Sequence, residues 1–116
     1  MQHVLTSYPA GQYAVFLTNH DQDRVMSTLK DEKSARLAAT MYLTSRGVPF
    51  IYYGEEIGMT GVKPDEDIRL PMKWNNEFGS GFSSGTPWRA ISKDNPEWNV
   101  ADQLADPDSL LRHYRK

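Results

Sequence analysis

Two apolar segments constrain the fold of this chain more than any other feature, because each ends abruptly in polar and ionisable residues. The first covers residues 16–21 and reads FLTNHD, and the second covers residues 47–56 and reads GVPFIYYGEE. In a parallel α/β protein, the working groups lie at the carboxyl ends of buried strands, because the loops that follow open onto the ligand face. The two segments therefore predict two parallel strands that carry functional groups at their carboxyl ends.

The first of these strands is expected to be buried and to be followed by a loop. Five apolar or aromatic residues, 13–17, follow the turn signal Pro9-Ala10-Gly11 and predict a fully buried strand. Residues 19–28 are mostly polar and predict a loop. The chain then changes to a helical pattern.

The helix is expected to begin at a cap, either Asp31 or Ser34, and to continue to about residue 46. Its predicted apolar stripe consists of Leu37, Ala38, Met41 and Tyr42. Gly47 and Pro49 end the helix, and residues 49–53 predict a second buried strand. The order strand, helix, strand implies a right-handed parallel crossover.

The C-terminal half is expected to be mostly a long loop. Residues 54–106 are rich in Gly, Pro, Asn and Trp, show no sustained period, and are too many for a simple connector. A final helix is expected to open at Asp106-Pro107, with Asp106 as its cap. Its apolar face consists of Leu110, Leu111 and Tyr114. So short a helix needs packing partners.

The composition is that of an ordinary globular chain, with 39% hydrophobic and 24% charged residues. The net charge of -2 and the lack of Lys/Arg clusters predict neither a nucleic-acid partner nor a membrane partner, and neutral ligands fit better. No apolar run approaches the roughly 20 residues of a membrane span, and Met1-Gln2-His3 does not begin a signal peptide. Without cysteine there is no disulfide framework, and the sequence does not indicate a cellular compartment.

Four ordered motifs carry a resemblance to a known family. They are residues 16–21, residues 47–56, the stretch 67–74 (DIRLPMKW), and the pair 79–82 (GSGF) with 86–89 (TPWR). From about Tyr8 to Lys116 the chain closely resembles the α-amylase family, glycoside hydrolase family 13, near its oligo-1,6-glucosidases and bacterial α-amylases. The resemblance implies an α/β fold, a partial TIM (β/α)8 barrel comprising strand 7, helix 7, strand 8, a long loop and the start of helix 8.

Residues 1–116 are accordingly expected to form a single, incomplete domain, the C-terminal fragment of the catalytic barrel, because a closed barrel takes about 250 residues. The family's nucleophile and acid/base belong to earlier segments and are not assigned here. The isolated chain is therefore predicted to be inactive. Expected partners are an α-glucan or maltooligosaccharide and the missing N-terminal part of the barrel.

The resemblance assigns chemical roles to the first motif. Retaining glycosidases use one carboxylate as nucleophile and a second as acid and base, and a third can grip sugar hydroxyls as the ring distorts. That third, transition-state-stabilising role falls to Asp21. Substrate binding is expected from His20, Asn19, Arg69 and Arg24. A metal site at His20, Asp21 and Asp23 is not expected, because three neighbours on a loop fit no regular ligand spacing.

The second motif is expected to support the site. Tyr52 and Tyr53 alternate along the strand, so only one can face the barrel interior. Gly54 permits a tight turn of the backbone at the end of the strand. Glu55 and Glu56, which follow it, are both expected to reach the ligand face. Their side chains diverge, which argues against an acid/base pair. The resemblance places Glu56, together with Tyr53, behind the catalytic groups.

The long loop offers further candidates. Its aromatic side chains could stack on sugar rings, although aromatics of a long ordered loop more often bury themselves. They are Trp74, Phe78, Phe82, Trp88 and Trp98. The acidic run 65–67 lacks the glycine and distal glutamate of an EF-hand loop and predicts a solvated turn. No cofactor is expected; calcium stays open for a full-length relative, with no site assigned here.

The predicted function is a fragment of a retaining α-glucan hydrolase, an α-amylase or α-glucosidase, acting on starch or maltooligosaccharides. Asp23 stands where exo-acting α-glucosidases of this branch usually carry proline, which favours an α-amylase. Residues 44–47 (TSRG) also occur in transglycosylating members of the family. They therefore do not decide whether the reaction is hydrolysis or glycosyl transfer. The alternative is a non-catalytic α-glucan-binding or scaffold module derived from the same barrel.

Overall fold

The computed structural model describes residues 7–9, 11–92 and 94–116. Met1-Gln2-His3, and Ala10 of the predicted turn, lie outside the described residues. The backbone N–H of Gln12 donates to the Pro9 carbonyl at 3.0 Å, as in a turn. In the described part of the chain, no helix is both long and apolar enough to cross a bilayer.

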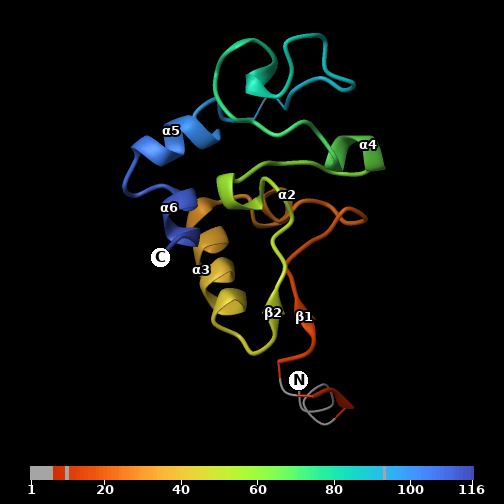
Figure 1. The fold of residues 1–116 in the computed structure, drawn as a ribbon, viewed down its shortest axis with the longest axis vertical. Helices are drawn as coiled ribbons and strands as arrows, with labels where there is room; N and C mark the ends of the chain where they lie inside the picture. The colour runs from red at the N-terminus through yellow and green to blue at the C-terminus, as the bar shows by residue number, and fades with distance from the viewer. Residues whose placement is uncertain (1–6, 10, 93) are drawn as a thin grey trace.

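A parallel pair of short strands joins the two motifs. β1 (Ala14–Val15) and β2 (Val48–Pro49) pair in the register Ala14 to Val48 and Val15 to Pro49 (Figure 1). The predicted order of strand, helix and parallel strand is confirmed, while the regular pairing is shorter than the predicted 13–17 and 49–53. The predicted full burial is wrong, because Phe16 and Phe50 are exposed. A parallel sheet is buried only where other elements cover both faces, and the described residues leave this face open.

The helix between the strands, α3 (Glu32–Leu43), has the predicted cap at Asp31, whose Oδ1 accepts from the backbone N–H of Ser34 at 2.9 Å. The predicted stripe is only partly right, because Leu37 and Met41 are each 63% exposed. The buried face consists instead of Ala35, Ala39 and Tyr42. α2 and α6 pack against this helix, and Ala35 joins a cluster with residues from both of them.

The predicted loop 19–28 contains a short helix, α2 (Val25–Leu29), so that prediction is wrong over its second half. Val25 and Met26 are buried, and Met26 packs with Ala35 and Leu110. Five residues make no helix by propensity alone. Packing against α3 and α6 therefore stabilises α2, and a local sequence pattern does not reveal that.

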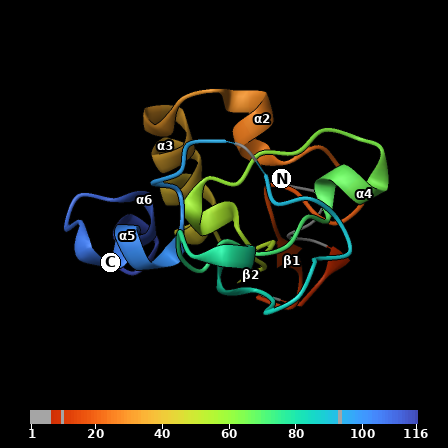
Figure 2. The same cartoon turned by 90° about the horizontal axis from the view of Figure 1, so that it is seen from above.

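The long segment after β2 is more structured than predicted. It contains η1 (Glu55–Ile57), α4 (Asp65–Ile68), η2 (Phe78–Gly81) and α5 (Val100–Ala105). The acidic run 65–67 thus forms the first turn of the helix α4 instead of a simple turn, while its side chains are exposed or partly exposed to solvent, as predicted. A second core cluster joins Ile57, Met59 and Met72. Seen from above, α5 and α6 lie on one side of the molecule and α4 on the other (Figure 2).

The last helix, α6 (Leu110–Tyr114), begins later than predicted. Its cap is Ser109, whose hydroxyl accepts from the backbone N–H of Arg112, whereas Asp106 ends α5. The predicted apolar face is confirmed: Leu110 is buried, and Leu111 and Tyr114 are partly buried against the two clusters. The pattern of apolar positions was therefore more informative than the Asp-Pro signal.

Candidate functional site

The candidate site lies just after β1, where an exposed carboxylate meets an arginine from the long segment. Asp21 Oδ1 accepts from Arg69 Nη2 at 3.0 Å, across 48 positions of sequence. Arg69 Nε also donates to the His20 carbonyl at 2.9 Å. The structure therefore brings together predicted site residues from two separate sequence motifs.

Local hydrogen bonds hold the carboxylate in this place. Asn19 Oδ1 accepts from the backbone N–H of Asp21 at 2.9 Å, a turn typical of asparagine. His20 Nε2 lies 3.3 Å from Asp21 Oδ2, and the Asp21 side chain is 61% exposed. A carboxylate has about four acceptor positions. Asp21 therefore keeps acceptor capacity for a ligand's hydroxyl groups.

Arg69 is itself held between two carboxylates. Its Nη2 donates to Asp65 Oδ2 at 2.7 Å as well as to Asp21. Asp65 in turn lies 3.1 Å from Lys63 Nζ, and the hydrogen bond from Lys63, together with the charge of Arg69, lowers the pKa of Asp65. Because α4 carries both Asp65 and the residues next to Arg69, this short helix sets the position of the arginine.

Arg24, which was predicted to bind substrate, does not join this exposed group. It is 2% exposed, and its Nη1 donates to the Tyr53 carbonyl at 2.6 Å. Its guanidinium lies over the rings of Tyr52 and Tyr53, 4.6 and 4.7 Å from their centroids. Arg24 therefore supports the two tyrosine rings from within the protein, and its cation–π contacts take the place of the water that would otherwise solvate the guanidinium.

Both tyrosines therefore turn towards Arg24, and the predicted alternation across the strand is wrong. The regular pairing of β2 ends at Pro49, and Gly54 follows in the left-handed region with φ 82°, so the chain is already turning at Tyr53. A Cβ at Gly54 would collide with the side chain of Met59. The tight backbone turn predicted at Gly54, where the chain leaves the strand, is confirmed.

The two tyrosine hydroxyls hold the backbone on either side of Arg69. Tyr52 donates to the Ile68 carbonyl at 3.0 Å, and Tyr53 donates to the Leu70 carbonyl at 2.7 Å. Arg24 thus supports the rings, and the rings support the segment that carries Arg69. The sequence offered no signal for this arrangement, because it depends on contacts between residues far apart in the chain.

Glu55 does not reach the ligand side, contrary to the prediction. It is 3% exposed, and its Oε1 accepts from the hydroxyls of Tyr42 at 3.0 Å and Tyr114 at 2.9 Å. Burial raises the pKa of Glu55, and the hydrogen bonds from Tyr114 and Tyr42 partly offset this. Glu55 therefore joins η1 to α3 and α6.

Glu56, which the resemblance places behind the catalytic groups, lies close enough to Arg24 for their charges to interact. Burial raises the pKa of Glu56, and backbone hydrogen bonds and the charge of Arg24 oppose that shift. Within the described residues, Glu56 Oε2 and the Nε and Nη2 atoms of Arg24 are buried without a hydrogen-bond partner. Two donor atoms of Arg24 and one acceptor atom of Glu56 are therefore buried and unpaired in this part of the chain.

A hollow of about 330 Å³ lies along the open face of the two strands. It ends at Asn19 and His20, and Phe16, Phe50 and Tyr52 are among the side chains that line it. Apolar walls with a few polar groups at one end are typical of ligand sites.

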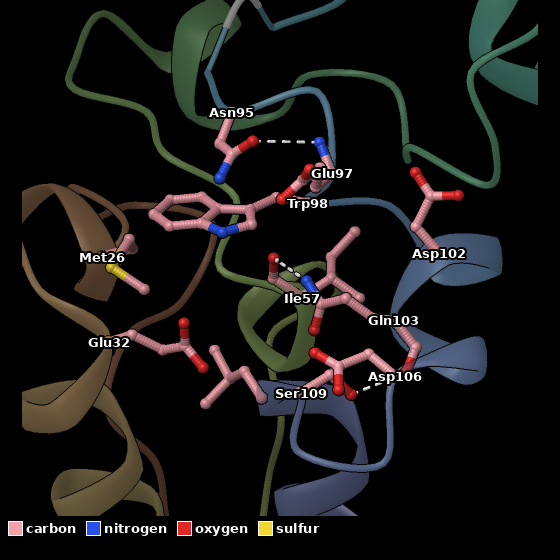
Figure 3. A pocket seen from close by; sticks show the side chains of 11 residues that line it. Met26, Glu32, Ile57, Asn95, Glu97, Trp98, Asp102, Gln103, Asp106 and Ser109 are labelled. Atoms are coloured by element: carbon pink, nitrogen blue, oxygen red, sulfur yellow. Dashed lines mark hydrogen bonds between the residues drawn. The ribbon is translucent and has the colours of Figure 1, made fainter.

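A second hollow, of about 430 Å³, lies between α2, α5 and α6 and contains none of the residues predicted for catalysis, for hydrogen bonding to the substrate or for support of the site (Figure 3). Trp98 and several carboxylates line it. Glu32 is paired with Arg36, and Asp102 accepts from Asn99 and Asn76. Among the described residues, no group of His, Asp or Glu could hold a metal ion. These engaged carboxylates make this hollow a poor candidate for the site.

The aromatic side chains of the long segment are mostly exposed, so the expectation that they bury themselves is wrong for four of them. Those four are Trp74, Phe78, Phe82 and Trp88. Trp98 alone among the five follows the expectation, because it packs against the cluster of Met26, Ala35 and Leu110. The exposed rings belong to a segment that sits at the edge of the molecule (Figure 1).

The fold and site define a parallel α/β unit with an exposed carboxylate group just beyond a strand. Residues 1–116 match the family described as alpha amylase, catalytic domain. The chain therefore belongs to the α-amylase family, glycoside hydrolase family 13.

Individual relatives agree with this assignment. The chain is 46% identical over 107 residues to alpha-amylase 3 of Dictyoglomus thermophilum, covering 89% of this chain and 21% of that protein. It is 31% identical over 147 residues to an oligo-1,6-glucosidase of Halalkalibacterium halodurans, covering 91% and 26%. The crystal structure of Bacillus licheniformis trehalose-6-phosphate hydrolase superposes with a TM-score of 0.83 at 32% identity, covering 90% and 26%. The chain thus spans between a fifth and about a quarter of the length of these proteins.

Proposed function

We propose that this chain contributes the transition-state-stabilising carboxylate, Asp21, to a retaining α-glucan hydrolase of the α-amylase or α-glucosidase type. The contact between Asp21 and Arg69 carries the proposal, because it joins two motifs of the resemblance at one exposed place. As the sugar ring distorts towards an oxocarbenium ion, charge-assisted hydrogen bonds from its hydroxyls to Asp21 strengthen. The curated relatives named α-amylase and oligo-1,6-glucosidase support an α-glucan as the substrate.

The neighbouring residues have distinct roles in this proposal. His20 and Arg69 donate hydrogen bonds to sugar hydroxyls, and Asn19 orients the turn that presents Asp21. Arg24 and Tyr53 act from behind by holding the segment of Arg69 in place, and Glu56 is proposed to support them through the attraction between its carboxylate and Arg24. Arg24 is thus proposed to position the site and not to touch the substrate.

In this proposal β1, α3 and β2 are strand 7, helix 7 and strand 8 of a TIM barrel, and residues 1–116 form one incomplete domain. The nucleophile and acid/base come from the rest of the barrel, which is the proposed protein partner. No cofactor takes part. The chain alone is expected to release no sugar from starch, because loss of members of a catalytic unit typically costs several orders of magnitude in rate.

Binding of maltotriose to the ¹⁵N-labelled chain, followed by NMR, tests the proposal. We expect the amide signals of His20 and Asp21 and the Nε–H signal of Arg69 to shift, with a Kd of about 1 mM. Asp21→Asn is expected to weaken binding about tenfold or more, because a hydrogen bond to a charged group contributes about 1.5–3 kcal/mol.

Glu66→Gln is the matched control, since Glu66 is an exposed carboxylate on the same short helix as Asp65. It is expected to leave the affinity unchanged. Shifts that avoid His20, Asp21 and Arg69, or an Asp21→Asn chain that binds as well as the parent, would overturn the proposal.

A further inference from the structure

We propose that Asp65 is a positioning residue for the candidate site, because it limits Arg69 to a single hydrogen bond with Asp21 and so keeps an oxygen of Asp21 free. This inference deepens the proposed function and rests on it for the ligand, an uncharged sugar. Arg69 Nη2 donates to Asp65 Oδ2 at 2.7 Å and to Asp21 Oδ1 at 3.0 Å. One nitrogen of the guanidinium is therefore shared between two carboxylates.

The other two arginine–carboxylate pairs of the described residues show how a guanidinium binds when it contacts only one carboxylate. Arg89 donates to Asp67 Oδ1 from Nε at 2.9 Å and from Nη2 at 2.6 Å. Arg36 likewise donates to Glu32 Oε1 from both Nε and Nη2. Arginine often binds a carboxylate through two N–H groups at once, which adds both energy and specificity. Both of these pairs therefore have the contact that an arginine favours.

Arg69 divides the same two donor nitrogens among three acceptors. Its Nε donates to the His20 carbonyl, and its Nη2 is shared between Asp21 and Asp65. Within the described residues, Asp21 Oδ2 accepts no hydrogen bond from Arg69. That oxygen therefore stays available to a sugar hydroxyl, which can donate to it.

Asp65 has the charge and the anchorage that this role requires. Its Oδ1 lies 3.1 Å from Lys63 Nζ, and the hydrogen bond from Lys63, together with the charge of Arg69, lowers the pKa of Asp65. It is therefore ionised at neutral pH. It also lies four positions before Arg69 along α4 and its C-terminal end, a spacing that brings two side chains together on a helix.

Without the charge of Asp65, the guanidinium would be attracted to Asp21 alone. A contact through two nitrogens would be stronger, and it would use acceptor positions of Asp21 that the sugar needs. The effect on stability would be small, because the side chains of Arg69 and Asp65 are 39% and 45% exposed. Asp65 is therefore expected to affect ligand binding more than folding.

NMR of the ¹⁵N-labelled 116-residue chain carrying Asp65→Asn tests this inference. We expect the Arg69 Nε–H signal to shift without any sugar, because this group turns from the His20 carbonyl towards Asp21. The affinity for maltotriose is expected to fall about fivefold, the scale of one net hydrogen bond. Asp65→Glu, which keeps a negative charge at this position, is expected to restore most of both readouts.

Arg69→Met shows whether Asp65 acts through the arginine. In the Arg69→Met chain, the addition of Asp65→Asn is expected to leave the affinity for maltotriose unchanged, because no guanidinium remains to be redirected. A further fall in affinity would mean that Asp65 acts on the sugar or on α4 directly, and it would overturn the inference.

Asp67→Asn is the matched control, because it removes the same charge from the same short helix but belongs to the pair with Arg89. It is expected to change neither the Arg69 signal nor the affinity. If Asp65→Asn behaves like Asp67→Asn while Asp21→Asn weakens maltotriose binding, the inference fails and the proposed function stands. If Asp21→Asn has no effect on maltotriose binding, the proposed function fails, and the Arg69 signal measured without sugar still decides whether Asp65 directs Arg69.

Discussion

Two carboxylates, each beyond the carboxyl end of one of the paired strands, have opposite surroundings. Asp21 follows β1, is 61% exposed and contacts the charged Arg69. Glu55 follows β2, is 3% exposed and accepts hydrogen bonds from the uncharged hydroxyls of Tyr42 and Tyr114. The place of a carboxylate beyond a strand therefore does not decide its role.

The surroundings of the side chain, solvent for Asp21 and packed helices for Glu55, decide the role of each carboxylate. Asp21 turns to solvent and keeps acceptor capacity for a ligand. Glu55 turns to the helices, where the protein's own donors engage it and burial raises its pKa. One carboxylate is exposed and is proposed to bind the ligand, and the other joins three parts of the fold. The following predictions test that contrast.

The largest effect is expected from Glu55→Ala. Removing this carboxylate leaves the hydroxyls of buried Tyr42 and partly buried Tyr114 without an acceptor, so the free energy of unfolding should fall by about 2–3 kcal/mol. Urea denaturation followed by circular dichroism measures the change. Glu66→Ala, at an exposed position, is the control and should change stability little. Equal midpoints for the two variants would contradict the structural role of Glu55.

A smaller effect is expected in the pH dependence of stability. Because the pKa of Glu55 is raised above its ordinary value of 4.5, the folded chain binds this proton more tightly than the unfolded chain. That contribution is full below the unfolded pKa and is lost as pH rises through the folded pKa. Glu55→Gln should therefore lose less stability than the parent between pH 4.5 and 8, in urea melts at several pH values. A parallel decline in both chains would argue against an elevated pKa.

The smallest effect on stability is expected from Asp21→Asn. The side chains of Asp21 and Arg69 are 61% and 39% exposed, and pairs so exposed to solvent contribute little. The free energy of unfolding should change by less than about 0.5 kcal/mol, while maltotriose binding weakens. A loss comparable with that of Glu55→Ala would mean that Asp21 is structural and would remove the contrast.

Much of the site could be predicted from sequence because its members lie next to each other in short motifs. Asn19, His20 and Asp21 are consecutive, and a polar triplet after an apolar run is visible without any structure. Arg69 was also predicted, through its motif. The burial of Arg24 could not be predicted, because it depends on the two tyrosine rings supplied 28 and 29 positions later.

The fold shows the same division. The cap of α3 is a local interaction between Asp31 and Ser34, and it was predicted correctly. α2 and α5 were missed, since each has only five or six residues. Helices of that length are held by tertiary packing more than by their own propensity.

By itself, the sequence determined the parallel strand–helix–strand order and the motif that carries Asp21, because hydrophobic pattern, caps and turn residues act over a few positions. Only the tertiary structure decided which of the two carboxylates meets solvent, and that Arg24 lies buried over Tyr52 and Tyr53. Burial and long-range hydrogen bonds depend on how elements pack, and the pattern within one segment does not contain that information.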